Sequence, residues 1–250
     1  MGDIPVVILC GGRGMRLREL TDIVPKPLVP IGDMPLVQHL MKIYASQGFK
    51  KFILLLGYKG DQIKKFFSSK KFKEENPGYD VTFVETGEKR NTGGRLKLAE
   101  NHVGSETFFA NYCDGLSDIN LKELLNYHKK KGRIATLTGV HTISRFGIIE
   151  VKDGMAKSFK EKPRMEDIVN GGYFVFNKEI FNYLDEDSVL EEEPLRRLTK
   201  ENQLSVFEHK GFWICMDTYK EYEMLNDVWK TGNMTFTGMK FDKPPWKIWE

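Results

Sequence analysis

The sequence predicts an α/β fold in which a mostly parallel sheet is flanked by helices. Three features predict it: short apolar runs of strand length, helical segments that alternate with these runs, and glycines at the junctions. Alternation of this kind builds βαβ units, whose right-handed crossovers make the strands parallel. With 250 residues, 40% of them apolar, the chain can bury the core of one large domain.

The first half of the chain contains the clearest alternation. Residues 6–10, VVILC, form a continuous apolar run that ends at a Gly-Gly pair, as expected of a central strand buried on both faces. Residues 35–47 carry apolar side chains at helical spacing and stop at Gly48. The pattern continues with strands at residues 52–56, 81–84 and 107–112 and helices at residues 61–67, 94–101 and 121–131.

The second half contains more strands than helices. Asp153-Gly154 separates two strand-like runs, at residues 146–151 and 156–161, and is a strong hairpin signal. The final segment DKPPWKIWE is rich in proline and tryptophan, so we expect an extended tail that docks on this subunit or on a neighbour. Further strands are predicted at residues 134–141, 172–176 and 204–209, and helices at residues 179–184, 190–200 and 218–229.

Composition excludes several classes of protein. The 38 basic and 35 acidic residues give a formal charge of +3, which argues against a nucleic-acid binder. The three cysteines are odd in number and far apart, which disfavours a disulfide framework and a structural zinc site. Neither a secretion signal nor an apolar run of membrane-spanning length is visible, so we expect a cytoplasmic protein without a membrane partner.

The loop GGRGMRL, residues 11–17, follows the first strand and indicates an anion site. Backbone N–H groups in a glycine-rich turn that opens into a helix can cradle phosphate. A dinucleotide fingerprint would need a glycine where Leu17 stands, and the Gly-Lys-Ser/Thr of a Walker loop is absent. Arg16 suits direct contact with phosphate oxygens. The alternative is an ordinary turn with two exposed arginines.

Two further residues favour a phosphate site over a turn. Lys26 stands between Pro25 and Pro27, which hold it in an extended backbone and present its ammonium rigidly. Asp114 follows the strand at residues 107–112 and can hold Mg²⁺, although an Asp-Gly pair is also a common turn. Residues 11–17, residues 86–95 and Asp114 each follow a predicted strand. Since ligands of open α/β sheets bind at the carboxyl ends of the strands, we expect these three loops to face one crevice.

These segments resemble the signature of the sugar-1-phosphate nucleotidylyltransferases, which usually reads GGxGTRL with a Pro-Lys pair downstream. Within that family the chain is most similar to the enzymes that use CTP and glucose 1-phosphate. The resemblance implies a Rossmann-like sheet of the nucleotide-diphospho-sugar transferase type, with a smaller sugar-binding part that contains a β-hairpin. It covers the whole chain, through GYKGDQIKKFF, TGGRLKLA, YCDG, RFG, FKEKP, VNGGYFVF, EPL, FEHKGFWICMDT and PPWKIWE.

The resemblance implies a Mg²⁺-dependent transfer of CMP from CTP to a sugar 1-phosphate, with glucose 1-phosphate the first candidate. It implies one nucleotidyltransferase domain, residues 1–250, with a nucleotide-binding half at 1–133, a sugar-phosphate-binding half at 134–225 and a tail at 226–250. We expect a homo-oligomer, because the tryptophan-rich tail suggests a partner subunit.

The resemblance also implies a role for individual residues. Arg16, Lys26, Asp114 and Asp217 would be catalytic, and the two aspartates would share one Mg²⁺. The nucleotide would be bound by Leu9, Gly11, Gly12, Gly14, Met15, Arg16, Lys26, Arg90, Thr92, Gly93 and Arg95. The sugar phosphate would be bound by Gly147, Glu161, Lys162, Asn170 and Gly171.

The chain departs from the family pattern at three places. Met15 stands where threonine is usual, Arg90 where a small polar residue is usual, and the segment before Thr86 is shorter. The alternatives are therefore a related enzyme that uses UTP, dTTP, GTP or another phosphorylated acceptor, and a non-catalytic nucleotide sensor. A sensor would be expected to have lost a catalytic residue, and none of those named above is missing.

Overall fold

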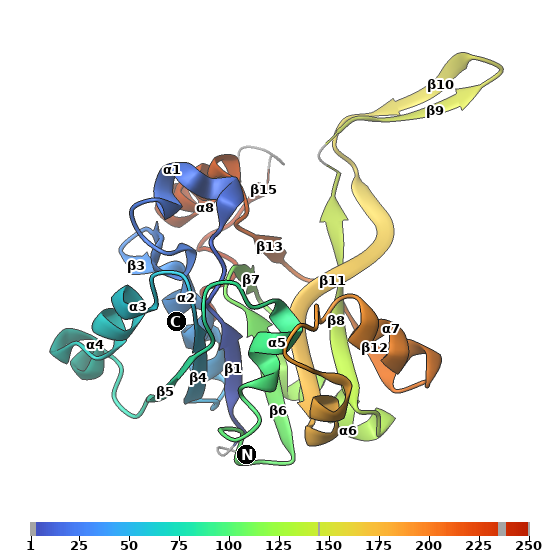
Figure 1. Cartoon of the computed structure of the whole chain (residues 1–250). Helices are drawn as coiled ribbons and strands as arrows, with labels where there is room; N and C mark the ends of the chain where they lie inside the picture. Colours follow the sequence, from blue (N-terminus) through green and yellow to red (C-terminus); the bar gives the residue numbers. More distant parts are fainter. Residues whose placement is uncertain (1–3, 145, 235–238, 250) are drawn as a thin grey trace.

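The computed structural model describes residues 4–144, 146–234 and 239–249. Its centre is a seven-stranded sheet with the strand order β12-β8-β11-β6-β1-β4-β5 (Figure 1). All neighbouring strands are parallel except β11, which runs antiparallel to both β6 and β8. The mostly parallel α/β sheet is thus confirmed. Its strands are β1 (Val6–Leu9), β4 (Lys51–Leu56), β5 (Asp80–Glu85), β6 (Thr107–Tyr112), β8 (Ala135–Ile143), β11 (Arg164–Asn177) and β12 (Leu204–His209).

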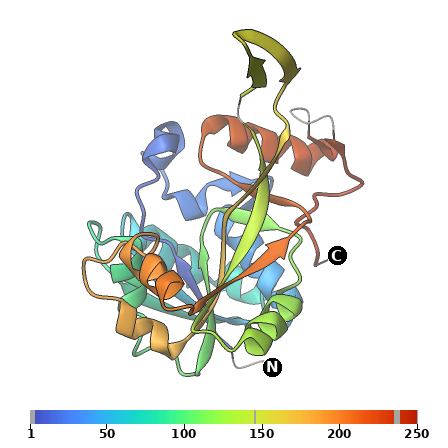
Figure 2. The ribbon, with the colours of Figure 1, turned by 90° about the vertical axis from the view of Figure 1, so that its right-hand side faces the viewer.

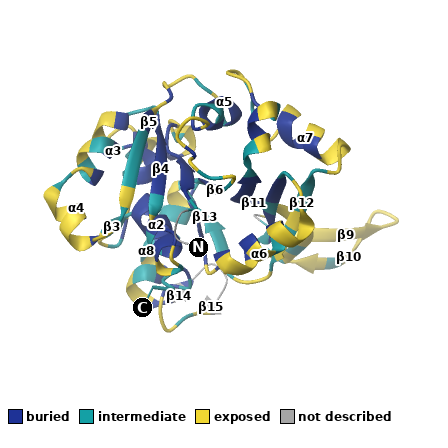
Figure 3. Ribbon diagram, turned by 90° about the horizontal axis from the view of Figure 1, so that it is seen from below, coloured by how far each residue is buried: buried dark blue, intermediate teal, exposed yellow. Residues whose placement is uncertain are grey.

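The sheet divides the core into two layers. Val6 and Ile8 of β1 pack on one face and Val7 and Leu9 on the other, because successive side chains of a strand point in opposite directions. Figure 3 shows β4, the neighbour of β1, in the dark blue of buried residues. The first face is covered by α2 (Leu36–Ser46), α3 (Gly60–Phe67), α6 (Leu121–Lys131) and α8 (Tyr219–Thr231), and the second by α5 (Thr92–Lys97), the 3₁₀ helix η3 (Lys178–Tyr183) and α7 (Glu193–Lys200).

Some boundaries differ from the predicted ones. The strand predicted at residues 172–176 is only the end of β11, which begins at Arg164 because its first part pairs with β8. The helix predicted at 190–200 begins at Glu193, with a proline in its first turn. The helix predicted at 94–101 is α5, and that at 179–184 is the 3₁₀ helix η3. The unpredicted elements are short: η1 (Met15–Leu17), α1 (Arg18–Thr21), η2 (Lys26–Leu28), β2 (Pro30–Ile31), β3 (Met34–Pro35), α4 (Lys70–Glu75), β7 (Gly115–Ser117), β13 (Trp213–Cys215), β14 (Asn233–Met234) and β15 (Met239–Lys240).

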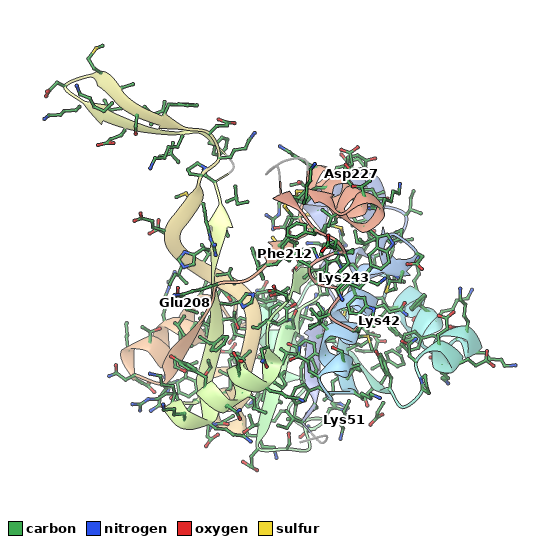
Figure 4. All side chains as sticks on the ribbon, turned by 180° about the vertical axis from the view of Figure 1, so that it is seen from behind. Lys42, Lys51, Glu208, Phe212, Asp227 and Lys243 are labelled. Atoms are coloured by element: carbon green, nitrogen blue, oxygen red, sulfur yellow. The ribbon has the colours of Figure 1, made fainter. Side chains whose placement is uncertain are left out.

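The predicted hairpin is confirmed and forms an arm that leaves the body of the molecule. Strands β9 (Ile148–Lys152) and β10 (Met155–Lys160) pair only with each other and extend beyond the sheet (Figures 1 and 2). Asp153 and Gly154 have φ values of 52° and 75°, the left-handed pair that a tight hairpin turn requires. All five residues of β9 are exposed, and Figure 4 shows the side chains of the arm standing clear of the domain.

The C-terminal tail docks on this subunit rather than on a neighbour. Trp246 is completely buried, and its indole N–H donates to Nδ1 of His39 at 3.3 Å. Nε2 of His39 donates to the carbonyl of Ile31 at 2.9 Å, which fixes one neutral tautomer of the ring. Burial lowers the pKa of His39 to about 4. The tail is therefore part of the core, and it gives no support for a partner subunit.

The helices of the described part of the chain include none that is both long and apolar enough to cross a membrane.

Candidate active site

Four charged side chains from distant parts of the chain meet above the carboxyl ends of β1 and β6. Nζ of Lys26 lies 2.6 Å from Oδ2 of Asp114 and 2.8 Å from Oδ1 of Asp217. Nη2 of Arg16 lies 3.0 Å from the other carboxylate oxygen of Asp217. These are the four residues that the resemblance implies as catalytic, and the structure brings all of them together. The extended backbone predicted for Lys26 is wrong, because Lys26 begins the 3₁₀ helix η2 and only Pro25 before it is extended.

Strand pairing places the two aspartates side by side. β7 and β13 are antiparallel neighbours, with Gly115 opposite Cys215, so the residues just beyond each strand also meet. The amide of Met216 donates to the carbonyl of Asp114 at 3.0 Å. Asp217 directly precedes α8, where Glu221 closes a capping box and accepts from the Asp217 amide at 2.8 Å. Backbone bonds on both sides therefore fix the separation of the two carboxylates.

The charges of this cluster support one another. Burial alone would lower the pKa of Lys26, but the negative charges of Asp114 and Asp217 outweigh burial and raise it. Burial would raise the pKa of Asp217, but Lys26 and Arg16 outweigh it and lower that pKa. Lysine and aspartate are therefore both ionised at neutral pH, and the ammonium sits where two carboxylates converge.

The donor set fits a magnesium ion that completes its shell with substrate and water. Two carboxylates already converge on one cation, and Mg²⁺ takes one or two protein carboxylates with phosphate and water oxygens. Across the described ranges no group of three or more His, Cys, Asp or Glu side chains is placed to hold a metal by itself. Burial raises the pKa of the adjacent Cys215 to about 12, so its thiol is protonated at neutral pH, and Mg²⁺ prefers oxygen ligands to sulfur.

The glycine-rich loop is packed against a buried arginine. Arg95 is 4% exposed, and its guanidinium donates to the carbonyls of Gly87 at 2.6 Å and Glu88 at 3.0 Å. A Cβ atom on Gly11 would lie 2.0 Å from Nη1 of Arg95, and one on Gly57 would lie 2.4 Å away. Glycine at these two positions therefore makes room for the guanidinium, which lies beneath the loop and joins it to the segment after β5.

The remaining residues of the predicted nucleotide set lie at the same edge of the sheet. Gly14 adopts the left-handed φ of 62°, Met15 is 66% exposed, and Leu9 ends β1. Thr92 and Gly93 contact the second half of the chain instead of the glycine-rich loop. The hydroxyl of Thr92 donates to Glu191, and Gly93 lies so close to Ser188 that there is no room for a Cβ atom. Arg90 likewise pairs with Glu186, at 3.4 Å.

The predicted sugar-phosphate residues form two groups. Gly147, Glu161 and Lys162 lie at the base of the arm, where Nζ of Lys162 is 3.0 Å from Oε1 of Glu161. Lys162 adopts a left-handed φ of 45°. Asn170 and Gly171 lie on β11, where the amide of Gly172 donates to Oδ1 of Asn170 at 2.9 Å. Residue 145 of the RFG segment lies outside the described residues.

Two residues at this edge of the sheet are absent from the predicted set. Glu191 accepts hydrogen bonds from Thr92 and from Tyr112, the last residue of β6. The sequence holds no signal for Glu191, which is one of three consecutive glutamates. Tyr112 precedes Asp114 by two residues, and that proximity is the signal from which it could have been found.

Comparison with known proteins places the chain among nucleotide-transferring enzymes. The family model described as "Nucleotidyl transferase" matches residues 5–227. The chain is 42% identical to a probable glucose-1-phosphate cytidylyltransferase of Bacillus subtilis strain 168, over 97% of this chain and 99% of that protein. It is 38% identical to the glucose-1-phosphate cytidylyltransferase of Salmonella typhimurium strain LT2, over 98% and 99%.

The solved structures agree on the fold. The crystal structure of HddC from Yersinia pseudotuberculosis complexed with GMP-PN matches with a TM-score of 0.72 at 24% identity, over 90% of this chain and 98% of that one. A putative glucose-1-phosphate thymidylyltransferase from Bacillus anthracis matches with a TM-score of 0.71 at 18% identity, over 96% and 98%. The family model and the full-length relatives together show that this chain belongs to the nucleotidyl transferase family.

Proposed function

We propose that this protein transfers CMP from CTP to glucose 1-phosphate and releases pyrophosphate. The observation that carries the proposal is the Lys26 ammonium held between Asp114 and Asp217 beside a glycine-rich loop. Two anionic substrates need positive charge between them in order to approach each other, and Lys26, Arg16 and a metal ion held by the two aspartates would supply it. The choice of CTP and glucose 1-phosphate is supported by the full-length relatives described above, which are cytidylyltransferases by name.

The chemistry needs positioning and charge neutralisation rather than a general base. An oxygen of the sugar phosphate would attack the α-phosphorus of CTP in line, while the bond from the α-phosphorus to the bridging oxygen of the leaving pyrophosphate breaks. That attacking oxygen is already largely ionised at neutral pH, because the second pKa of a phosphate monoester is about 6. Lys26 and Arg16 would stabilise the charge that develops on the phosphoryl oxygens.

Mg²⁺ held by Asp114 and Asp217 would polarise the phosphate oxygens and so assist the transfer. Asp114 and Asp217 would hold that ion, and Lys26, which lies between the same two carboxylates, would contact the phosphates beside it.

Each substrate would bind to a different part of the chain, the nucleotide to residues 1–133 and the sugar phosphate to residues 134–225. The amides of Gly11, Gly12 and Gly14 would face the triphosphate. A cavity of about 350 Å³, lined by residues 86–91 and by Glu186 and Asp187, is large enough for a pyrimidine base. Glu161, Lys162, Asn170 and Gly171 would contact the sugar phosphate.

A pyrophosphate-release assay with CTP, UTP, dTTP and GTP against a panel of sugar 1-phosphates tests the proposal. CTP with glucose 1-phosphate should be the fastest pair and should require Mg²⁺. Preference for another nucleotide or acceptor would move the protein to a related transferase, and no turnover with any pair would indicate a nucleotide sensor.

The Asp114→Asn variant should lower kcat by about 10³-fold or more, because a metal-binding charge at the reacting phosphate contributes several kcal/mol. Its circular dichroism spectrum should be unchanged, since the carbonyl of Asp114, rather than its side chain, bonds the backbone of Met216. Turnover within a few-fold of the native rate would refute the metal assignment.

We further propose that the protein is a homo-oligomer and that the arm contacts a second copy. The arm exposes large apolar side chains: Phe146 at 76%, Val151 at 63%, Met155 at 67% and Phe159 at 63%. Apolar patches of this kind are a feature of protein interfaces. Light scattering after size exclusion should give a mass of at least twice the 28.9 kDa of one chain, and the mass of a single chain would refute the proposal.

A further inference from the structure

Residues 186–191, called here the joint segment, connect the second half of the chain to the loop before α5. The amide of Gly94 donates to the carbonyl of Ser188 at 2.9 Å, and the amide of Leu190 donates to Oγ1 of Thr92 at 3.0 Å. A Cβ atom on Gly94 would lie 2.1 Å from the carbonyl oxygen of Glu186. The two glycines of the TGGR segment are therefore explained by close contact with the joint segment.

The joint segment ends at a carboxylate that bridges two elements of the active site. One oxygen of Glu191 accepts from Oγ1 of Thr92 at 2.7 Å, and the other accepts from the phenol of Tyr112. The two donors belong to different elements: Thr92 is the first residue of α5, and Tyr112 is the last residue of β6. A carboxylate is the side chain best suited to this task, because it accepts two hydrogen bonds on separate oxygens.

Tyr112 connects this bridge to both substrate regions. It lies two residues before Asp114, and its ring is packed against Gly172, where a Cβ atom would lie 2.5 Å from Cδ2. Gly172 directly follows Gly171, which belongs with Asn170 to the predicted sugar-phosphate set. Burial raises the pKa of Tyr112, and the charge of Glu191 raises it further, so the phenol remains a donor at any working pH.

We propose that Glu191 is a positioning residue for the transfer reaction, which holds Thr92 and Tyr112 at a fixed separation and so sets the start of α5, with Gly93 and Arg95 of the proposed nucleotide set, relative to Asp114 and β11. This inference rests on the proposed function. In-line transfer between two separately bound anions is sensitive to their relative placement, and a displacement of about 1 Å can cost a hundredfold in rate. Loss of the bridge should therefore lower kcat more than it raises either KM.

The test compares Glu191→Ala and Glu191→Gln with the matched control Glu192→Ala, which removes the same charge one residue away. Glu191→Ala should lower kcat by about 10- to 100-fold and change KM for CTP and for glucose 1-phosphate by less than about threefold. Glu191→Gln should recover most of that loss, because its carboxamide still pairs with both hydroxyls. Glu192→Ala should behave as the native enzyme.

A double-mutant cycle with Tyr112→Phe identifies the route of the effect. If Glu191 acts through Tyr112, the double variant should lose no more kcat than the worse single variant. Native kcat in Glu191→Ala, an equal loss in Glu192→Ala, or fully additive losses in the cycle would each overturn the proposal. So would a raised KM for one substrate at unchanged kcat, which would make Glu191 a direct ligand.

Thermal unfolding of the four proteins of the cycle, namely the native protein, Glu191→Ala, Tyr112→Phe and the double variant, separates this inference from the proposed function. A coupling between Glu191→Ala and Tyr112→Phe in the unfolding midpoint would show the bridge even if the native protein failed to turn over CTP and glucose 1-phosphate. An absence of coupling in the midpoint would remove the bridge while leaving the cytidylyltransferase proposal intact.

Discussion

The glycine-rich loop at residues 11–17, called here the nucleotide loop, and the arm are built in opposite ways. At the nucleotide loop, β1 is buried along its whole length, and Arg95 fills the space left by Gly11 and Gly57. In the arm, every residue of β9 is exposed, and among the strands that the structure describes β9 pairs with β10 alone. A two-stranded hairpin is at best marginally stable in water, whereas a sheet covered on both faces is stable alone. We therefore expect the nucleotide loop to be formed before substrate arrives, and the arm to be stabilised by a second copy as proposed above.

The largest effect in this comparison is expected from Gly11→Ala, which tests whether the nucleotide loop is rigid. The new Cβ atom would lie 2.0 Å from Nη1 of Arg95, which cannot move without losing its bonds to Gly87 and Glu88. Overpacking of this kind costs about 1–3 kcal/mol. We expect that loss in the free energy of unfolding, measured by urea titration.

Gly12→Ala is the matched control, because nothing lies within 4 Å of the Cβ position at Gly12. Its free energy of unfolding should stay within about 0.5 kcal/mol of the native value. Equal stability of the two variants would mean that Arg95 leaves its position easily and that the loop is not preformed.

The core strands and part of the candidate site could be predicted from the sequence. The core strands were predictable because a buried strand needs a continuous apolar run, as in VVILC. That residues 11–17 and Asp114 lie at one edge of the sheet was predictable, because they follow β1 and β6, and parallel strands present their carboxyl ends at one edge. Both predictions depend on local patterns and on the topology that such patterns imply.

Contacts between distant segments were not predictable. Arg95 carries no mark of burial in its own neighbourhood, because the space that it fills is left by Gly11 and Gly57, which are distant along the chain. The resemblance assigns Gly93 to the nucleotide, and only the position of residues 186–188 shows that Gly93 and Gly94 make room for a neighbouring segment. The first part of β11 has exposed residues on both faces, so it lacks the alternation by which a strand is recognised.

A smaller effect is expected from charging the arm, which tests whether a second copy covers it. Val151→Lys with Met155→Lys changes two side chains that are 63% and 67% exposed, so the unfolding midpoint of the domain should hardly move. If these side chains lie in an interface, two buried charges should dissociate the oligomer in light scattering. KM for glucose 1-phosphate should rise a few-fold, because Glu161 and Lys162 stand at the base of the arm.

Lys157→Gln, on the same hairpin, is the control and should keep the native mass. An unchanged mass in the doubly charged variant would show that the arm does not join copies of the chain, and an altered mass in the control would point to general disruption of the hairpin.

The smallest effect is expected at Met15, where the nucleotide loop departs from the threonine usual in this family. Its side chain is 66% exposed and stands at the start of η1, so its replacement leaves no cavity. The phosphate contacts proposed above come from glycine amides and from Arg16 and Lys26, and a hydroxyl at position 15 would add at most one bond to an anion already held by several charges. Met15→Thr should therefore change KM for CTP and kcat by less than about threefold, which corresponds to less than about 0.7 kcal/mol. A tenfold fall in KM for CTP would show instead that the loop lacks a phosphate contact that the hydroxyl supplies, and that methionine at position 15 lowers the affinity of this protein for its nucleotide.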